Sequence, residues 1–260
     1  MKKQPIGVFD SGIGGTSILR EIVKLLPHED FIYLADSANA PYGEKSSNEI
    51  IDLCKKNVDY LLSQNCKLIV VACNTATTNA INILRSIYSI PFIGIEPAIK
   101  PAILNTKTNT IGVLATKGTL TSKLFAEKIN IYSQENQIIE VVGKGLVELL
   151  EQGDFSSTKL VGLVTSYVKP MLDKKIDYLV LGCSHYPYLL PILKKITPKS
   201  VKIIDSGEAV ARQTFNVLKN NCLLELVKTK GSIVFCANSN INTLKKICKK
   251  HFDNFKIKCI

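Results

Sequence analysis

Two cysteines of the chain stand where a pair of thiols could move protons. Cys73 and Cys183 each follow an apolar run, residues 68–72 and 178–182, and each opens a polar segment. A thiolate removes a proton and a thiol returns one, so two thiols that face one substrate carbon supply a base on one side and an acid on the other. A helix is predicted after each cysteine, and its N-terminal N–H groups and dipole should lower the pKa of both thiols.

Two further ionisable residues belong to this pattern. His185 follows Cys183 by two positions, and Asp10 ends the first apolar strand. We expect Asp10 to assist proton movement at Cys73, and His185 to assist it at Cys183. A single cysteine with His185 would also suit a cysteine hydrolase or amidotransferase, but that chemistry leaves the second thiol without a role.

Strand and helix patterns alternate along the chain. The predicted strands are residues 6–9, 31–35, 68–72, 92–95, 110–115, 138–142, 178–181 and 201–204. The predicted helices are residues 16–26, 49–63, 75–87, 97–104, 119–129, 144–152 and 156–174. Such alternation indicates parallel sheets with helices on both faces.

Two stretches repeat at nearly equal offsets. Residues 6–10 (Ile-Gly-Val-Phe-Asp) reappear as residues 111–115 (Ile-Gly-Val-Leu-Ala), and the surroundings of Cys73 reappear at Cys183. We therefore predict an α/β fold with two pseudo-symmetric, doubly wound, mostly parallel sheet domains and the active site between them.

Ligands of such sheets bind beyond the carboxyl ends of the strands. Nearly all residues at these positions are polar or ionisable: Asp10-Ser11, Asp36-Ser37, Cys73-Asn74-Thr75, Glu96, Thr116, Cys183-Ser184-His185 and Asp205-Ser206. Any one of them could cap the helix that follows it, but together they indicate a binding site.

A glycine turn follows the first strand. Residues 12–17 (Gly-Ile-Gly-Gly-Thr-Ser) nearly match the dinucleotide-binding pattern, and Asp36 lies where a ribose-binding acid would lie. However, Ser17 replaces the third glycine, and the Asp10 carboxylate would repel a pyrophosphate in this turn. We therefore do not expect a nucleotide.

The composition excludes several classes of protein. The 260 residues can bury the cores of two domains, and no apolar run approaches the roughly 18 residues of a membrane span. The eight cysteines include no Cys-x-x-Cys pair, which argues against a zinc ribbon or a thioredoxin-type site. We expect a soluble, cytoplasmic protein with reduced thiols and no metal. The six other cysteines should be small buried hydrophobic residues, and His28 and His251 should be solvated.

The net charge of +11 raises the question of a nucleic-acid partner. Most of the basic residues are lysines, whereas surfaces that read bases favour arginine. Lysines cluster in residues 241–260, where their spacing predicts the solvated face of an amphipathic helix. A nucleic acid is therefore not the expected partner.

Six ordered motifs resemble those of the glutamate racemases, the cofactor-independent group of the aspartate/glutamate racemase superfamily. They are residues 7–15, 35–43, 72–77, 94–98, 181–187 and 204–207, so the resemblance spans the chain. It implies interconversion of L- and D-glutamate without pyridoxal phosphate or a metal, which supplies D-glutamate for peptidoglycan.

The resemblance also implies roles for individual residues. Cys73 would take the α-proton of D-glutamate, and Cys183 that of L-glutamate. The implied substrate contacts are Asp10, Ser11, Pro41, Tyr42, Gly43, Asn74, Thr75, Ser184 and His185. The family usually has threonine where this chain has Ser184, which keeps the hydroxyl group.

A glutamate near the end of one helix belongs to the family's site as well. It corresponds to Glu151 in this chain, with Glu148 as the rival. The C-terminal helices of the family return to the first domain, so the resemblance implies domains of residues 1–97 plus 209–260 and of residues 98–208.

Two alternatives stay open at this point. The first is an aspartate racemase or another amino-acid racemase of the same superfamily, because motifs around the bases do not measure the length of a substrate. The second is a non-catalytic protein that kept the pocket and engages DNA through its basic surface. We expect glutamate as the small-molecule partner, and a homodimer whose interface the sequence does not reveal.

Overall fold

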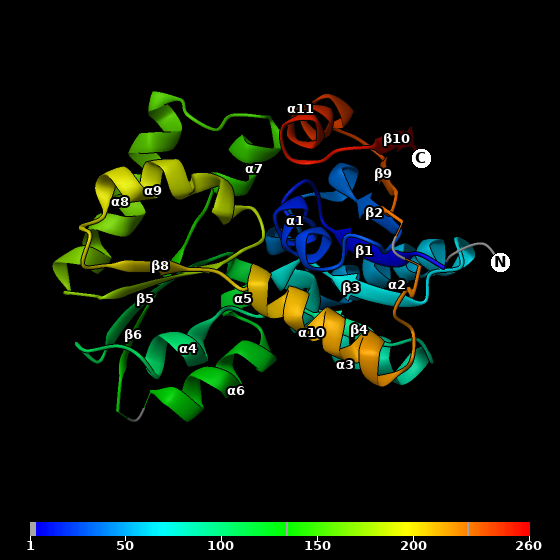
Figure 1. The fold of residues 1–260 in the computed structure, drawn as a ribbon. Helices are drawn as coiled ribbons and strands as arrows, with labels where there is room; N and C mark the ends of the chain where they lie inside the picture. The colour runs from blue at the N-terminus through cyan, green and yellow to red at the C-terminus, as the bar shows by residue number, and fades with distance from the viewer. Residues whose placement is uncertain (1–3, 134, 228) are drawn as a thin grey trace.

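The computed structural model describes residues 4–133, 135–227 and 229–260, and it shows an α/β protein with two sheets (Figure 1). Within these residues the first sheet has six strands in the order β10-β9-β2-β1-β3-β4, and the second has four in the order β6-β5-β7-β8. All strand pairs are parallel. The strands are β1 (Ile6–Asp10), β2 (Phe31–Ala35), β3 (Leu68–Val71), β4 (Phe92–Gly94), β5 (Thr110–Ala115), β6 (Gln137–Val142), β7 (Tyr178–Gly182), β8 (Lys202–Ile204), β9 (Ile233–Ala237) and β10 (Phe255–Cys259).

Helices connect the strands and cover the sheets. The α-helices are α1 (Thr16–Leu25), α2 (Ser47–Ser63), α3 (Asn74–Ile87), α4 (Ile99–Ile103), α5 (Lys117–Leu120), α6 (Lys123–Tyr132), α7 (Leu146–Glu151), α8 (Thr158–Asp173), α9 (Leu190–Ile196), α10 (Gly207–Asn220) and α11 (Ile241–His251). Short 3-10 helices are η1 (Ser37–Asn39), η2 (Tyr42–Glu44) and η3 (Tyr186–Leu189). None of the helices in the described ranges has the length and apolar character that crossing a membrane requires.

The inner strands of the first sheet are apolar on both faces, and both faces are covered. Every residue of β1 and β3 is buried. Val8 packs into one core with Ile18 of α1 and Val210 of α10, while Phe9 packs into another core with Ile81 of α3. Burial of such a side chain stabilises the fold by about 1.5–3 kcal/mol. The rigid strands therefore fix where their polar C-terminal ends lie.

The second sheet repeats the strand order of the first. The order β2-β1-β3-β4 corresponds to β6-β5-β7-β8, and the register repeats as well, because Ile6 pairs with Leu68 and Ile111 pairs with Tyr178. In this correspondence Cys73 and Cys183 occupy equivalent positions after β3 and β7. The predicted α/β fold with two related parallel sheets is confirmed.

The chain passes from one sheet to the other twice. It leaves the first sheet after β4, forms β5 to β8 in the second, and returns with α10, which packs against α1. Figure 1 shows the second sheet with its green and yellow helices beside the blue first sheet, which the orange and red C-terminal strands extend. We propose residues 1–97 with 209–260 and residues 98–208 as the two domains.

The predicted helix over residues 119–129 is wrong in detail. The structure has two helices there, α5 and α6, because Ser122 caps a new helix by accepting a hydrogen bond from the N–H of Phe125. The other predicted strands and helices agree with the structure within two residues at each end.

The basic C-terminal residues form a helix and a strand. The helix α11 buries Leu244 and exposes its lysines, as the amphipathic pattern predicts. Beyond it Lys256 and Lys258 alternate with Phe255 and Ile257, which is the period of a strand, and this segment is the edge strand β10. Neither β10 nor its neighbour β9 was predicted.

Candidate active site

Both strand-end cysteines line one small cavity, with a volume of about 10 Å³. The residues that line it are Ser11, Pro41, Tyr42, Gly43, Cys73, Asn74, Thr75, Thr116, Val147, Cys183, Ser184 and His185. They come from the C-terminal ends of strands in both sheets and from the connections that follow them. The cavity thus lies where the alternating fold predicts a ligand site.

Cys73 lies directly before α3 and caps it. Its sulfur accepts a hydrogen bond from the N–H of Ala76 (3.4 Å), and its S–H donates to Oγ of Ser11 (3.6 Å). Burial raises the pKa of Cys73 well above its usual range, and the nearby charge of Asp10 raises it further. The predicted lowering of this pKa by the helix is therefore wrong, because one N–H group does not offset the loss of hydration.

His185 joins the thiol of Cys183 to a buried carboxylate. Its Nδ1 atom lies 3.8 Å from Sγ of Cys183, and its Nε2 atom lies 2.6 Å from Oε1 of Glu151. The same Glu151 oxygen accepts a hydrogen bond from the N–H of Ile13 (2.7 Å), in the glycine turn of the first half. Cys183, His185 and Glu151 are all buried.

His185 and Glu151 stabilise each other's charge. Burial acts to lower the pKa of His185, but the hydrogen bonds to Cys183 and Glu151 outweigh it and raise that pKa well above 6.5. Burial likewise acts to raise the pKa of Glu151, but the hydrogen bond and charge of His185 lower it below its usual value. Both shifts favour an ion pair of imidazolium and carboxylate, with the ring beside the Cys183 sulfur.

The two candidate glutamates of α7 differ clearly in their surroundings. Glu151 is 5% exposed and contacts His185 and the backbone of Ile13. Glu148, one turn earlier, is half-buried, and neither glutamate lines the cavity directly. The geometry favours Glu151 over Glu148 as the glutamate that serves the site.

Asp10 lies behind the wall of the cavity. Its side chain is fully buried, with Oδ2 accepting from the N–H of Gly15 (2.6 Å) and Oδ1 accepting from Oγ of Ser184 (3.2 Å). Burial raises the pKa of Asp10, although the His185 charge opposes this effect. The side-chain contact to the Cys73 thiol comes from Ser11, and the charge of Asp10 raises the pKa of that thiol.

The glycine turn after β1 receives side chains of the second half. A Cβ atom on Gly12 would lie 1.9 Å from Oε1 of Glu151, and one on Gly14 would lie 2.2 Å from Nδ1 of His185. Any side chain at either position would collide with the pair. The turn is therefore rich in glycine because protein groups approach its backbone, which accounts for its likeness to a dinucleotide-binding turn.

Asp36 supports the cavity wall from behind. It accepts hydrogen bonds from the hydroxyl of Tyr42 (2.5 Å) and from the amides of Asn39 (2.8 Å) and Asn238 (2.5 Å). Asn57 in turn donates to the Tyr42 oxygen (3.0 Å). Asp36 thus fixes Tyr42, next to Pro41 and Gly43, instead of meeting a ribose.

Asn74 brings a buried amide to the cavity. It is 2% exposed, and among the described residues neither its Oδ1 nor its Nδ2 atom has a hydrogen-bond partner. An unpaired buried polar group costs about 1–3 kcal/mol, and a ligand that both donates and accepts hydrogen bonds removes that cost. Beside it, the hydroxyl of Thr75 lies 2.7 Å from that of Thr116 and 3.3 Å from that of Thr119.

Two cavity residues are absent from the substrate contacts that the resemblance implies. Thr116 directly follows β5 and was marked only by its strand-end position. Val147 is an apolar residue of α7 and carries no such signal in the sequence. Conversely, the strand ends at Glu96 and Asp205 lie elsewhere, where Glu96 pairs with Lys128 and Asp205 accepts from the N–H of Gly207.

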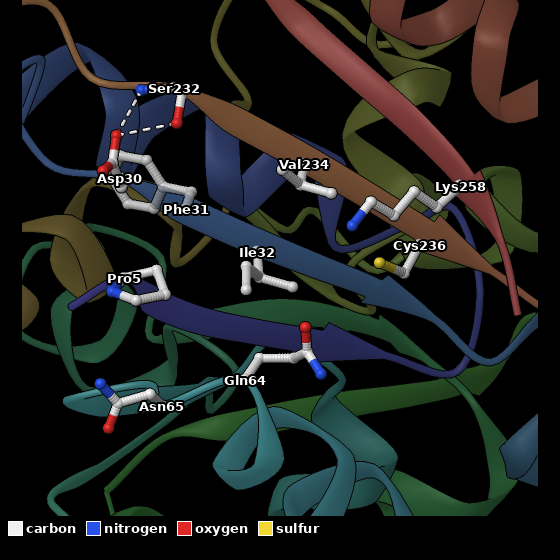
Figure 2. A pocket seen from close by; sticks show the side chains of 10 residues that line it. All are labelled: Pro5, Asp30, Phe31, Ile32, Gln64, Asn65, Ser232, Val234, Cys236 and Lys258. Carbon is white, nitrogen blue, oxygen red and sulfur yellow. Dashed lines mark hydrogen bonds between the residues drawn. The ribbon is translucent and has the colours of Figure 1, made fainter. Parts of the chain in front are cut away.

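A second hollow lies on the first sheet, away from the two thiols (Figure 2). Its floor includes Ile32 of β2 and Val234 of β9, and at one end Ser232 donates two hydrogen bonds to Asp30. None of the predicted site residues lines it. The candidate active site is therefore the cavity between the two sheets.

The remaining cysteines lie outside the cavity. Four of them are buried as predicted: Cys54, Cys66, Cys236 and Cys248. Cys222 and Cys259 are exposed, so the prediction of burial is wrong for these two. His28 and His251 are half-buried instead of fully solvated, and the ring of His251 lies 6.5 Å from that of Tyr188.

Known proteins resemble this chain in sequence and in fold. A sequence profile of the Asp/Glu/Hydantoin racemases matches residues 6–214. The glutamate racemase of Herpetosiphon aurantiacus is 45% identical over 247 residues, which cover 95% of this chain and 97% of that protein.

Two solved structures have the same fold. The glutamate racemase isoform RacE1 from Bacillus anthracis superposes with a TM-score of 0.89 at 29% identity, covering 100% of this chain and 98% of that one. The glutamate racemase from Francisella tularensis in complex with D-glutamate superposes with a TM-score of 0.84 at 30% identity, covering 99% and 98%. Since the profile and these relatives span most of its length, the chain belongs to the Asp/Glu/Hydantoin racemase family.

Proposed function

We propose that the chain is a glutamate racemase that interconverts L- and D-glutamate with two thiols. The observation that carries this proposal is the placement of Cys73 and Cys183, from equivalent positions of two related halves, on one cavity. The choice of glutamate is supported by relatives of 43–47% identity that are glutamate racemases.

The proposed reaction transfers one proton on each side of the α-carbon. One cysteine, as thiolate, removes the α-proton, and the other, as thiol, delivers a proton to the opposite face of the carbanion. The C–H bond thus breaks toward one sulfur and forms again from the other, so each turnover exchanges the protonation states of the two cysteines. Reverse turnover or proton exchange with solvent restores them. We assign Cys73 to D-glutamate and Cys183 to L-glutamate.

Polar groups of the cavity hold the substrate and spread the charge of the carbanion. The helix α3 begins at Asn74, so its first N–H groups are suited to a carboxylate. The Asn74 amide and the hydroxyls of Ser11, Thr75 and Ser184 add donors in a space that excludes most water. With no electron sink, these donors must supply the stabilisation.

The two thiols have different partners in this mechanism. At Cys183 the His185 imidazolium stabilises the thiolate and can return a proton to it, while Glu151 keeps the ring charged and oriented. At Cys73 the Asp10 charge favours the thiol, and the Ser11 hydroxyl accepts its S–H. These roles for Asp10, His185 and Glu151 are proposals.

The setting of the reaction follows from its chemistry. Both thiols must stay reduced, which fits the cytoplasm, and D-glutamate would be supplied to peptidoglycan synthesis. The homodimer stays a prediction, which sedimentation velocity of the purified chain measures.

The decisive experiment is solvent exchange at the α-carbon. Purified protein in D₂O, with no added cofactor and with a chelator present, should incorporate deuterium at Cα of both L- and D-glutamate, followed by NMR, while circular dichroism records racemisation. Turnover of aspartate and not of glutamate would indicate an aspartate racemase. Activity that needs pyridoxal phosphate or that stops on chelation would contradict the two-thiol mechanism, and exchange with neither amino acid would leave a binding protein.

A further inference from the structure

We propose that Ser37 and Asn240 are positioning residues that hold Glu151 in place for His185, an inference that rests on the proposed racemase function. The hydroxyl of Ser37 and the side-chain amide of Asn240 each donate a hydrogen bond to Oε2 of Glu151, both at 3.1 Å. Oε2 is the oxygen that does not face His185.

The carboxylate of Glu151 is held on all sides by this arrangement. Oε1 accepts from His185 and from the N–H of Ile13, and Oε2 accepts from Ser37 and Asn240. Rotation of the carboxylate would break at least two of these four bonds. The donors to Oε2 therefore fix the direction in which Oε1 meets the imidazolium.

The two donors come from the half of the molecule opposite to Glu151. Ser37 follows β2 and Asn240 follows β9, and these strands are neighbours in the first sheet. Glu151 ends α7, which packs in the core of the second sheet. The bonds to Oε2 thus cross the contact between the two halves. The position of the His185–Glu151 pair therefore depends on how the two halves meet.

The two donors differ in exposure, which sets the expected size of their effects. Ser37 is 6% exposed, so its bond to a buried carboxylate is shielded from water. Asn240 is exposed and adopts a left-handed conformation (φ 53°), which asparagine tolerates better than most residues. Substitution of Asn240 by glycine removes the amide and keeps that backbone conformation accessible.

The proposed role concerns only one face of the substrate. Glu151 orients His185, and His185 contacts Cys183. Cys73 is contacted by Ser11 and Ala76 instead. Loss of either donor should therefore impair proton removal by Cys183 and spare proton removal by Cys73.

The test uses a reaction that needs only the first proton transfer. A glutamate with chlorine on its β-carbon loses its α-proton to the enzyme and chloride from the neighbouring carbon, and the resulting enamine hydrolyses to 2-oxoglutarate and ammonia. The rate of 2-oxoglutarate formation from the L and D forms thus reports Cys183 and Cys73 separately. The variants are Ser37→Ala and Asn240→Gly, with Asn254→Gly as the control, because Asn254 is also left-handed (φ 51°) and exposed in the same C-terminal segment.

We expect elimination from the L form to fall about 10-fold in Ser37→Ala and about 3-fold in Asn240→Gly, as for loss of a shielded and of an exposed hydrogen bond to a charged group. Elimination from the D form, and both rates in Asn254→Gly, should stay within about 2-fold. Equal losses for the two forms, or no loss in either variant, would overturn the positioning role. An unmodified protein that is inactive on both forms would reject the racemase function itself, and this role with it.

Discussion

Gly14 lies directly against the ring of His185: a Cβ atom on Gly14 would stand 2.2 Å from Nδ1 and 2.5 Å from Cγ. Gly14 belongs to the turn after β1, whereas His185 follows β7 of the other sheet. The close approach of this backbone to the ring therefore helps to fix the position of the ring beside the Cys183 sulfur.

The change Gly14→Ala should displace the imidazolium and largely abolish racemisation. The added methyl group overlaps the ring, and such overpacking also costs about 1–3 kcal/mol of stability. We expect activity to fall at least about 100-fold while the circular dichroism spectrum stays that of a folded α/β protein. The control is Gly162→Ala, since Gly162 lies on the exposed face of α8 with nothing within 4 Å of its added Cβ. That variant should keep full activity and gain about 0.5–1 kcal/mol.

Cys73→Ala and Cys183→Ala should each abolish racemisation of both enantiomers. Removal of either sulfur leaves one face of the carbanion without a proton donor, and general acid/base catalysis contributes about 10²–10⁴-fold. Polarimetry or circular dichroism of L- and D-glutamate solutions measures the loss. Cys222→Ser and Cys259→Ser should leave turnover intact, because both residues are exposed and lie outside the cavity. A comparable loss in either control would refute the assignment of the two bases.

Cys73→Ser and Cys183→Ser should impair opposite first steps. A serine hydroxyl still carries a proton but is a much weaker base than a thiolate. Since the enantiomers have equal free energy in solution, kcat/KM for racemisation must remain equal in the two directions, and racemisation itself cannot reveal the difference. Exchange of the α-hydrogen or elimination from a β-chloro analogue can. Cys73→Ser should mainly slow exchange or elimination from the D form, and Cys183→Ser mainly from the L form. Equal slowing of both forms in both variants would favour a single thiol with His185 as its partner.

Glu151→Gln should lower the free energy of unfolding by about 3 kcal/mol, because it removes one charge of a buried ion pair. Because the pKa of Glu151 is lowered in the folded protein, its contribution to stability is fully present above pH 4.5 and is lost as the pH falls through the lowered pKa. Because the pKa of His185 is raised in the folded protein, its contribution to stability is fully present below pH 6.5 and is lost as the pH rises through the raised pKa. The difference between the two proteins should thus be largest between pH 4.5 and 6.5.

Urea unfolding at pH 3.5, 5.5 and 9 measures this dependence, with Glu148→Gln as the control. Glu148 is half-buried on the same helix, and its change should alter stability by no more than about 0.5 kcal/mol at any of these pH values. A pH-independent difference for Glu151→Gln would show that the pair is not ionised in the folded protein.

Much of this site could be predicted because strand ends are visible in a sequence. Apolar runs that stop at a polar residue marked Cys73 and Cys183, and the parallel fold brings such ends to one edge of each sheet. The same rule placed Thr116 at the site and gave no way to exclude Glu96. Which strand ends share a cavity depends on how two sheets meet, and local patterns do not contain that information.

Other features depend on contacts between distant segments. The hydrogen bond from Asn240 to Glu151 joins the start of α11 to the end of α7, and no pattern in the sequence near either residue indicates this contact. The raised pKa of Cys73 also escaped prediction, because the helix that follows it is visible in the sequence whereas the depth of its burial is not. The strand β10 was not predicted because lysines alternate with its apolar residues, a composition that suits an exposed edge strand.

The repeated strand order of the two halves has a stereochemical consequence. Two copies of one unit made of L-amino acids can be superposed by rotation and never by reflection, whereas the two forms of glutamate are mirror images. When Cys73 is aligned with Cys183, Asp10 corresponds to Ala115 and Thr75 corresponds to His185. The environments of the two sulfurs therefore differ. We therefore expect different KM values for the two enantiomers, and the form with the lower KM must have the lower kcat in the same proportion.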